Sequence, residues 1–166
     1  LSTGVTTCLP TVITGSEDWP IQCFHALEAG RNASKLAQAM VPGYHLEGPF
    51  LNPDEGFCGC HPTKWMRSAT WDHFERLQEA AGGRITLITV APEIKGVLDL
   101  IPKWVEKGIA VAIGHCNPDR DTLLRAADAG ATLSTHLGNG IAQMLPKIDN
   151  PILGQLAEDR FSASFI

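Results

Sequence analysis

Three residues of types that commonly bind metal ions stand where strand-like stretches of the sequence end. Glu47 ends one apolar stretch, and His115 and His136 each follow directly after a later one. A carboxylate and two imidazoles at one place would supply three metal ligands and leave a fourth position open to water, as in catalytic rather than structural zinc sites. By spacing alone, a metal site and a set of hydrogen-bonded structural residues are equally good interpretations.

The remaining histidines and the cysteines favour simpler interpretations. His45 lies two residues before Glu47, so both side chains point to the same side of the strand, and we expect a packing or supporting role for His45. His25 and His73 lie in helical stretches, where we expect solvated faces. The spacing of Cys58-Gly59-Cys60 does not match the paired cysteines of a zinc–thiolate site, which indicates free thiols.

The elements that must position these residues can be predicted from the apolar pattern. Near-continuous apolar, β-branched runs are typical of strands that are covered on both faces. Six such runs predict strands at Val5–Ile13, Gly43–Gly48, Ile85–Ala91, Ile109–Gly114, Ala131–Thr135 and Phe161–Ile166.

Helical stretches lie between these runs. Thr70 can cap a helix that ends at Gly82-Gly83, and a second apolar helical face runs from Ile94 to Gly108 with a predicted kink at Pro102. Asn117-Pro118 predicts the start of a third helix, which ends at Gly130.

Alternating strands and helices predict right-handed parallel units, in either a doubly wound sheet or a (β/α)8 barrel. No glycine-rich dinucleotide fingerprint follows the first strand, which counts against the doubly wound form. A full barrel takes roughly 250 residues. We therefore expect an α/β fold, a partial (β/α)8 TIM barrel of about six consecutive β/α units, forming one domain over residues 1–166.

Composition limits the partners of the chain. With 166 residues, 44% hydrophobic and 19% charged, it reads as a soluble, globular protein with one core. The net charge of -5 gives no reason to expect nucleic acid or an anionic membrane as a partner. Five cysteines, an odd number, favour a reducing compartment, and we expect a cytoplasmic protein.

The motifs, taken in order, are similar to those of a known family. The run His45-Leu46-Glu47-Gly48-Pro49-Phe50-Leu51-Asn52-Pro53 resembles the glutamate motif of the N-acetylglucosamine-6-phosphate deacetylases, which belong to the amidohydrolase superfamily. Thr89-Val90-Ala91-Pro92-Glu93 resembles the next strand, and Gly114-His115 and Thr135-His136-Leu137 resemble the two histidine motifs. The resemblance covers essentially the whole chain.

This resemblance implies an enzyme that removes acetate from N-acetylglucosamine 6-phosphate. It implies that Glu47, His115 and His136 bind one divalent metal ion, for which we expect zinc, with iron or manganese as alternatives. The substrate, a small amino sugar, would be bound by four further residues. These are His61, Asn139, Gly140, and Lys147 in place of the family's usual arginine.

Some parts of the family's machinery are expected outside the sequence. A His-x-His pair that can hold a second metal would precede Leu1, and the general-base aspartate would follow Ile166, as would a further histidine on the seventh strand. We therefore expect a fragment that is inactive alone, from a protein that is a homodimer when complete.

Three other interpretations stay open. The altered stretch Leu137-Gly138-Asn139-Gly140-Ile141 is compatible with an amidohydrolase that acts on a different amide or a cyclic imide. A non-catalytic, metal-binding relative would bind metal without turnover. A doubly wound binding domain without metal would keep the three proposed ligands apart.

Overall fold

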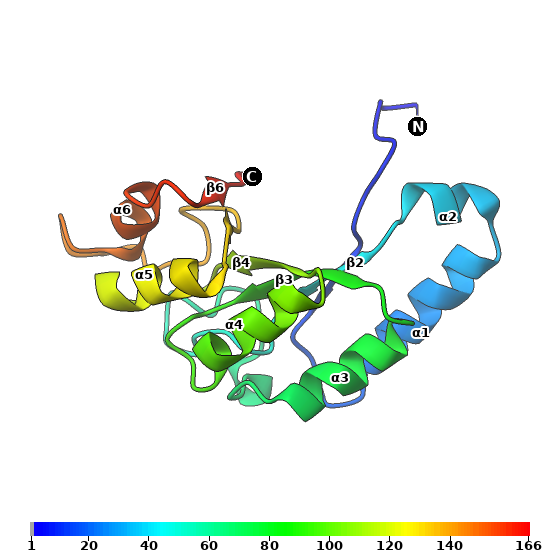
Figure 1. The fold of residues 1–166 in the computed structure, drawn as a ribbon, viewed down its shortest axis with the longest axis horizontal. Coiled ribbons are helices and arrows are strands. Elements are labelled where there is room, and N and C mark those ends of the chain that lie inside the picture. Colours follow the sequence, from blue (N-terminus) through cyan, green and yellow to red (C-terminus); the bar gives the residue numbers. More distant parts are fainter. Residues whose placement is uncertain (1) are drawn as a thin grey trace.

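The computed structural model describes residues 2–166, and within them parallel strands alternate with helices (Figure 1). The elements are β1 (Thr11–Ile13), α1 (Trp19–Asn32), α2 (Lys35–Met40), β2 (Tyr44–Glu47), the 3-10 helix η1 (Thr63–Trp65), α3 (Trp71–Ala80), β3 (Ile85–Val90), α4 (Val97–Glu106), β4 (Ala110–Ile113), α5 (Arg120–Ala129), β5 (Leu133–Ser134), α6 (Pro151–Leu156) and β6 (Ser162–Ala163).

The six described strands form one parallel sheet in the order β1-β2-β3-β4-β5-β6. A doubly wound sheet reverses its strand order at a switch point, and this sheet does not. Strands that follow one another in chain order are instead an arc of a (β/α)8 barrel, which agrees with the prediction. The arc is not closed within residues 2–166, because β1 and β6 are its two edges.

All six predicted strands are present, but most are shorter than predicted. The first begins at Thr11 rather than Val5, and the last is confined to Ser162–Ala163. Pro10 lacks the N–H that a ladder needs, and the side chain of Val5 is exposed, so little holds the preceding residues to the sheet. The apolar runs predict the positions of the strands correctly, but the runs are longer than the hydrogen-bonded strands.

The helices differ from prediction in extent and number. The predicted helices correspond to α3, α4 and α5, whereas α1, α2, η1 and α6 were not assigned bounds from the sequence. The predicted start of α5 at Asn117-Pro118 is wrong: the helix begins at Arg120, because the Asp119 side chain accepts a hydrogen bond from the Thr122 N–H at 2.8 Å. Pro102 lies inside α4, which is continuous from Val97 to Glu106.

The two faces of the sheet have different environments. Val12, Leu46, Ile88 and Val111 lie in register across four strands and are almost fully buried beneath the helices. On the other face, Leu87 and Leu133 are only half-buried. His45, Glu47, Thr89 and Ala112 on this inner face are nevertheless buried. The expectation of strands covered on both faces is therefore correct for these inner-face positions and incorrect for Leu87 and Leu133.

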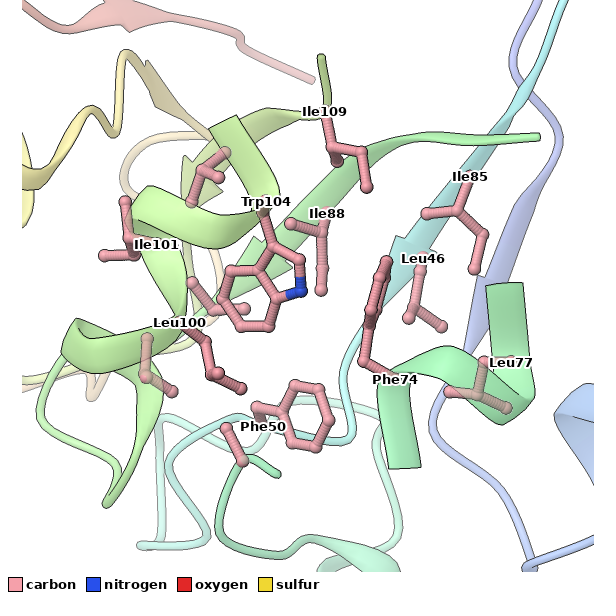
Figure 2. Packing of buried hydrophobic residues seen from close by; sticks show 14 of the residues in the cluster. Leu46, Phe50, Phe74, Leu77, Ile85, Ile88, Leu100, Ile101, Trp104 and Ile109 are labelled. Atoms are coloured by element: carbon pink, nitrogen blue, oxygen red, sulfur yellow. The ribbon is translucent and has the colours of Figure 1, made fainter. Parts of the chain in front are cut away.

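The core extends from the outer face of the sheet into the loop that follows Glu47. Figure 2 shows Trp104 of α4 between Phe74 of α3 and Phe50, all fully buried. The Phe50 and Trp104 rings are stacked with their centroids 6.2 Å apart, and the Phe74 ring meets Trp104 edge-on at 5.7 Å. Such pairs contribute about 0.5–1.5 kcal/mol beyond the area they bury. Phe50 thus anchors the loop after β2 in the core.

A buried polar cluster closes the amino-terminal end of the sheet. The Tyr44 hydroxyl, at the start of β2, donates a 2.6 Å hydrogen bond to Glu28 of α1, and Arg84 donates to the other Glu28 oxygen at 2.8 Å. This cluster joins α1 to two strands at the end opposite to Glu47.

In the described part of the chain, no helix is both long and apolar enough to cross a membrane.

We predict that Tyr44→Phe lowers the free energy of unfolding by about 2 kcal/mol, because it removes a buried hydrogen bond to a charged acceptor. Arg76→Ala is the control. It breaks an ion pair with Glu17 at 3.3 Å in which both side chains are about half exposed, so the change should stay within about 0.5 kcal/mol. Urea denaturation measures both, and equal losses in the two variants would contradict the assignment.

The stability of wild type and that of Tyr44→Phe should also respond differently to alkaline pH. Burial and the hydrogen bond to Glu28 raise the pKa of Tyr44 from 10.0 to about 12. The folded state therefore holds a proton that the unfolded chain releases, so this contribution is complete below pH 10 and is lost between pH 10 and about 12. The stability difference between wild type and Tyr44→Phe should shrink in that window, and a constant difference would contradict the shift.

Candidate metal centre

Glu47, His115 and His136 meet at the carboxyl-terminal end of the sheet. One ligand atom from each lies within 4.8 Å of the other two, although the residues come from β2 and from the loops after β4 and β5. Glu47 Oε1 lies 3.0 Å from His136 Nε2 and 3.3 Å from His115 Nε2. Glu47 and His115 are buried and His136 is half-buried. The carboxyl ends of parallel strands open to one side of a barrel, which is why these residues can converge.

Both histidines have an unusual backbone conformation. The φ angles of His115 and His136 are 51° and 34°, and they are the only non-glycine residues with positive φ among those described. This conformation costs about 1–2 kcal/mol in a residue with a Cβ. Hydrogen bonds hold it in place: the Asn52 N–H donates to the His115 carbonyl at 3.0 Å, and the His136 N–H donates to Ser164 Oγ at 2.8 Å. Backbone strain of this kind is concentrated at functional sites.

The His115 ring is held between two glycines. A Cβ at Gly59 would lie 2.7 Å from the ring, and a Cβ at Gly140 would lie 2.6 Å from it. Both glycines also have positive φ. No other residue would allow the loops after β2 and β5 to approach the imidazole this closely.

The hydrogen bonds of His115 determine which of its nitrogens faces Glu47. Nδ1 lies 2.8 Å from the Phe57 carbonyl, which can only accept, so Nδ1 carries the proton. In the neutral ring Nε2 then carries a lone pair, and it faces a carboxylate oxygen. The two repel unless a cation lies between them, either a second proton on the ring or a metal ion. Nitrogen and carboxylate donors suit zinc, iron or manganese, so the group could hold such an ion.

The electrostatics of the group centre on the Glu47 carboxylate. Burial by itself would raise the pKa of Glu47, but the close His115 and His136 rings outweigh it and hold that pKa well below its usual range. The same contact with Glu47 raises the pKa of His136 against the opposing effect of burial. His136 Nδ1 is buried without a hydrogen-bond partner in the described structure. A negative charge therefore persists at the centre of the group.

His61 lies beside the group, as the sequence comparison implied. Its ring centroid is 4.5 Å from that of His115, and its Nδ1 lies 3.0 Å from Thr14 Oγ1. Burial, together with the nearby charge of His115, lowers the pKa of His61 to about 4. His61 is therefore a neutral imidazole at the edge of the three-residue group. Thr14, which follows β1, was not identified from the sequence, because a single threonine carries no motif.

His45 is buried and hydrogen-bonded on the inner face of the sheet, which fits the packing role expected for it. His45 Nδ1 lies 3.0 Å from Thr11 Oγ1, and its Nε2 lies 2.7 Å from Thr89 Oγ1, which in turn lies 2.7 Å from Thr135 Oγ1. This chain of hydrogen bonds crosses the inner face directly beneath the metal-binding group. The prediction for His73 is wrong, because His73 is half-buried against the Phe50 ring rather than solvated. His25 is exposed, as predicted.

The other predicted substrate residues lie in the loop after β5. Gly140 contacts the His115 ring, and Asn139 is exposed, with its Oδ1 accepting a hydrogen bond from the Gly140 N–H. Lys147 is exposed farther along this loop, and it makes no salt bridge in the described part of the chain. The structure thus brings Gly140 to the group and shows no contact of Lys147 with it. All five cysteines are free thiols.

The comparisons with known proteins point in one direction. No model of a protein family matches the chain. An N-acetylglucosamine-6-phosphate deacetylase of Bacillus subtilis (strain 168) is 32% identical in an alignment of 166 positions that covers 98% of this chain and 41% of that protein. An N-acetylgalactosamine-6-phosphate deacetylase of Shewanella sp. (strain ANA-3) is 35% identical in an alignment of 148 positions that covers 85% of this chain and 34% of that protein.

The fold agrees with the sequence relatives. The crystal structure of N-acetyl-D-glucosamine-6-phosphate deacetylase from Mycobacterium smegmatis matches with a TM-score of 0.82 and 28% identity, covering 96% of this chain and 40% of that one. The open sheet is therefore an arc of a TIM barrel, and the chain spans about two fifths of its relatives' length. By sequence and by fold, this chain matches the N-acetylglucosamine-6-phosphate deacetylases over nearly its whole length.

Proposed function

We propose that the protein carrying this chain is a metal-dependent hydrolase that converts N-acetylglucosamine 6-phosphate to glucosamine 6-phosphate and acetate. The observation that carries this proposal is the convergence of Glu47, His115 and His136 at the active end of a barrel sheet. Relatives named as deacetylases of acetylated amino-sugar phosphates support the choice of reaction. Residues 1–166 would be part of one amidohydrolase barrel domain.

In this proposal Glu47 and the two histidines hold one divalent ion, with zinc as the first choice and iron or manganese as alternatives. Such an ion, when bound, polarises the acetamide carbonyl and lowers the pKa of a bound water. Glu47 supplies the negative charge that retains the dication. The Phe57 carbonyl keeps the proton of His115 on Nδ1, which leaves Nε2 free to bind. Proton transfer is assigned to an aspartate expected beyond Ile166, so this chain alone should be inactive.

His61 is suited to orient the substrate. If the Thr14 hydroxyl donates to Nδ1, the neutral ring carries its proton on Nε2 and can donate to an oxygen of the sugar or of the reacting amide. The low pKa of His61 keeps its ring uncharged at neutral pH. The ring therefore does not compete with the metal ion for the negative charge of Glu47. Thr14 is in this scheme the residue that sets the tautomer.

The phosphate would be bound by the loop after β5. Asn139 and Gly140 offer backbone groups next to the metal-binding group, and Lys147 offers a positive charge on the same loop. Lysine provides a point charge without the bidentate fork of arginine. We further propose a cytoplasmic homodimer for the complete protein.

One relative favours a second substrate. The Shewanella protein that is 35% identical to this chain acts, by its name, on N-acetylgalactosamine 6-phosphate, which differs in the orientation of one hydroxyl group. The activity test therefore includes both sugars.

We predict that the purified protein contains about one equivalent of divalent metal by elemental analysis. Glu47→Gln, His115→Ala and His136→Ala should each lose it, because two ligands rarely retain a dication against solvent. His25→Ala is the matched control, since His25 is exposed on α1 and away from the group. A well-folded wild type without metal would contradict the three-ligand site.

For activity, we predict acetate release from N-acetylglucosamine 6-phosphate by the longest open reading frame that contains this segment. His61→Ala should lower kcat/KM by about 100-fold, because it removes one donor to the reacting groups. Turnover of only a different amide would support another amidohydrolase activity. Metal binding without turnover of any amide or imide would indicate a non-catalytic relative.

A further inference from the structure

Glu93 is a half-buried residue whose carboxylate the proposed reaction does not use. It follows β3 and lies outside the group of three metal-binding residues. One of its oxygens, Oε1, accepts two hydrogen bonds: from the Asn117 N–H at 2.6 Å and from Asn52 Nδ2 at 2.9 Å. The other oxygen, Oε2, is buried and has no hydrogen-bond partner within residues 2–166. Glu93 makes no ion pair there either, so its burial costs free energy.

Asn52 extends these contacts to the loop that carries Glu47. Its side chain donates to Glu93, its Oδ1 accepts from the Asp54 N–H at 2.8 Å, and its own N–H donates to the His115 carbonyl at 3.0 Å. Asn52 is itself buried. Glu93 and Asn52 thus tie together the loops that follow β2, β3 and β4.

These bonds hold the two peptide units that follow the Cα of His115. The Asn52 N–H fixes the carbonyl of His115, and Glu93 fixes the N–H of Asn117 two residues later. On the preceding side the Gly114 N–H donates to the Val90 carbonyl at 3.2 Å. Between these anchors His115 holds a φ of 51°, a conformation that it would leave if the peptides around it were free to rotate. The direction of its Cβ, and with it the position of Nε2, depends on that φ.

We propose that Glu93 is a positioning residue, which acts through Asn52 and the Asn117 N–H to aim His115 Nε2 at the metal ion. This inference depends on the proposed metal site. The positioning role requires that Glu93 Oε1 accept two hydrogen bonds. A glutamine at this position keeps that oxygen, so it should position His115 almost as well as the native carboxylate. Residues that support metal ligands from behind typically change metal affinity by 10–100-fold.

The test compares metal affinity with stability in matched variants. Zn²⁺ and Co²⁺ affinities are measured by competition with a chromophoric chelator, and thermal unfolding is followed without metal. Glu93→Ala should weaken binding by about 10–100-fold. Glu93→Gln should bind within about threefold of wild type, because it keeps Oε1 as an acceptor for both donors.

Glu28→Ala is the matched control for lost packing. It also removes two side-chain hydrogen bonds from a largely buried carboxylate, but at the opposite end of the sheet. It should lower the unfolding temperature and leave metal affinity unchanged. If Glu93→Ala does not fold, Glu93→Asp replaces it, because the shorter side chain withdraws the acceptor by about 1.5 Å while keeping the charge.

The outcomes separate the two proposals. Absence of metal from a folded wild type contradicts the proposed function. Equal metal affinity in wild type and in Glu93→Ala or Glu93→Asp, with only the unfolding temperature lowered, overturns the positioning role and leaves the metal site intact. Weakened affinity in Glu93→Ala that Glu93→Gln restores supports the role, because simple loss of packing would not be repaired by one acceptor atom.

Discussion

The curvature of the sheet is the constraint on which the site depends. Glu47 ends β2, whereas His115 and His136 follow β4 and β5, and in a flat sheet these positions would be separated by the strands between them. Their ligand atoms nevertheless lie within 4.8 Å of one another. Only a sheet that bends around its inner face brings them together, and the helices that bury the outer face enforce that bend. The fold is therefore a requirement of the chemistry.

Stability and function are built into opposite ends of this sheet. At the amino-terminal end, Tyr44, Glu28 and Arg84 pair fully, and every charged oxygen has a partner. At the carboxyl-terminal end, a carboxylate faces an imidazole lone pair, and two histidines hold strained backbone conformations. These contacts cost free energy in the absence of a cation. The aromatic core around Trp104 offsets this cost. Phe50 packs in that core and belongs to the loop that follows Glu47.

The loops that follow β2 and β5 surround His115 and hold it in position. Phe57 fixes the tautomer, Gly59 and Gly140 allow the close approach of two loops, and Asn52 holds the carbonyl. Asn52, Phe57 and Gly59 belong to the loop after β2, and Gly140 belongs to the loop after β5. A change in any one loop would therefore be felt at the metal-binding group without touching a ligand, and the assignment of roles to Glu93 and Asn52 follows from this arrangement.

The sequence by itself determined the class of fold and the three metal-binding candidates. Parallel strands and intervening helices follow from apolar runs and caps, which are local signals, and Glu47, His115 and His136 were found because each stands at a strand end. The hydrogen-bonded extent of the edge strands and the start of α5 could not be predicted, because they depend on partners such as the Asp119 side chain. Only the tertiary structure decided that the three candidates converge, that Phe57 sets the tautomer of His115 and that Thr14 lies beside His61. These are distances between residues far apart in the chain, and no local pattern encodes them.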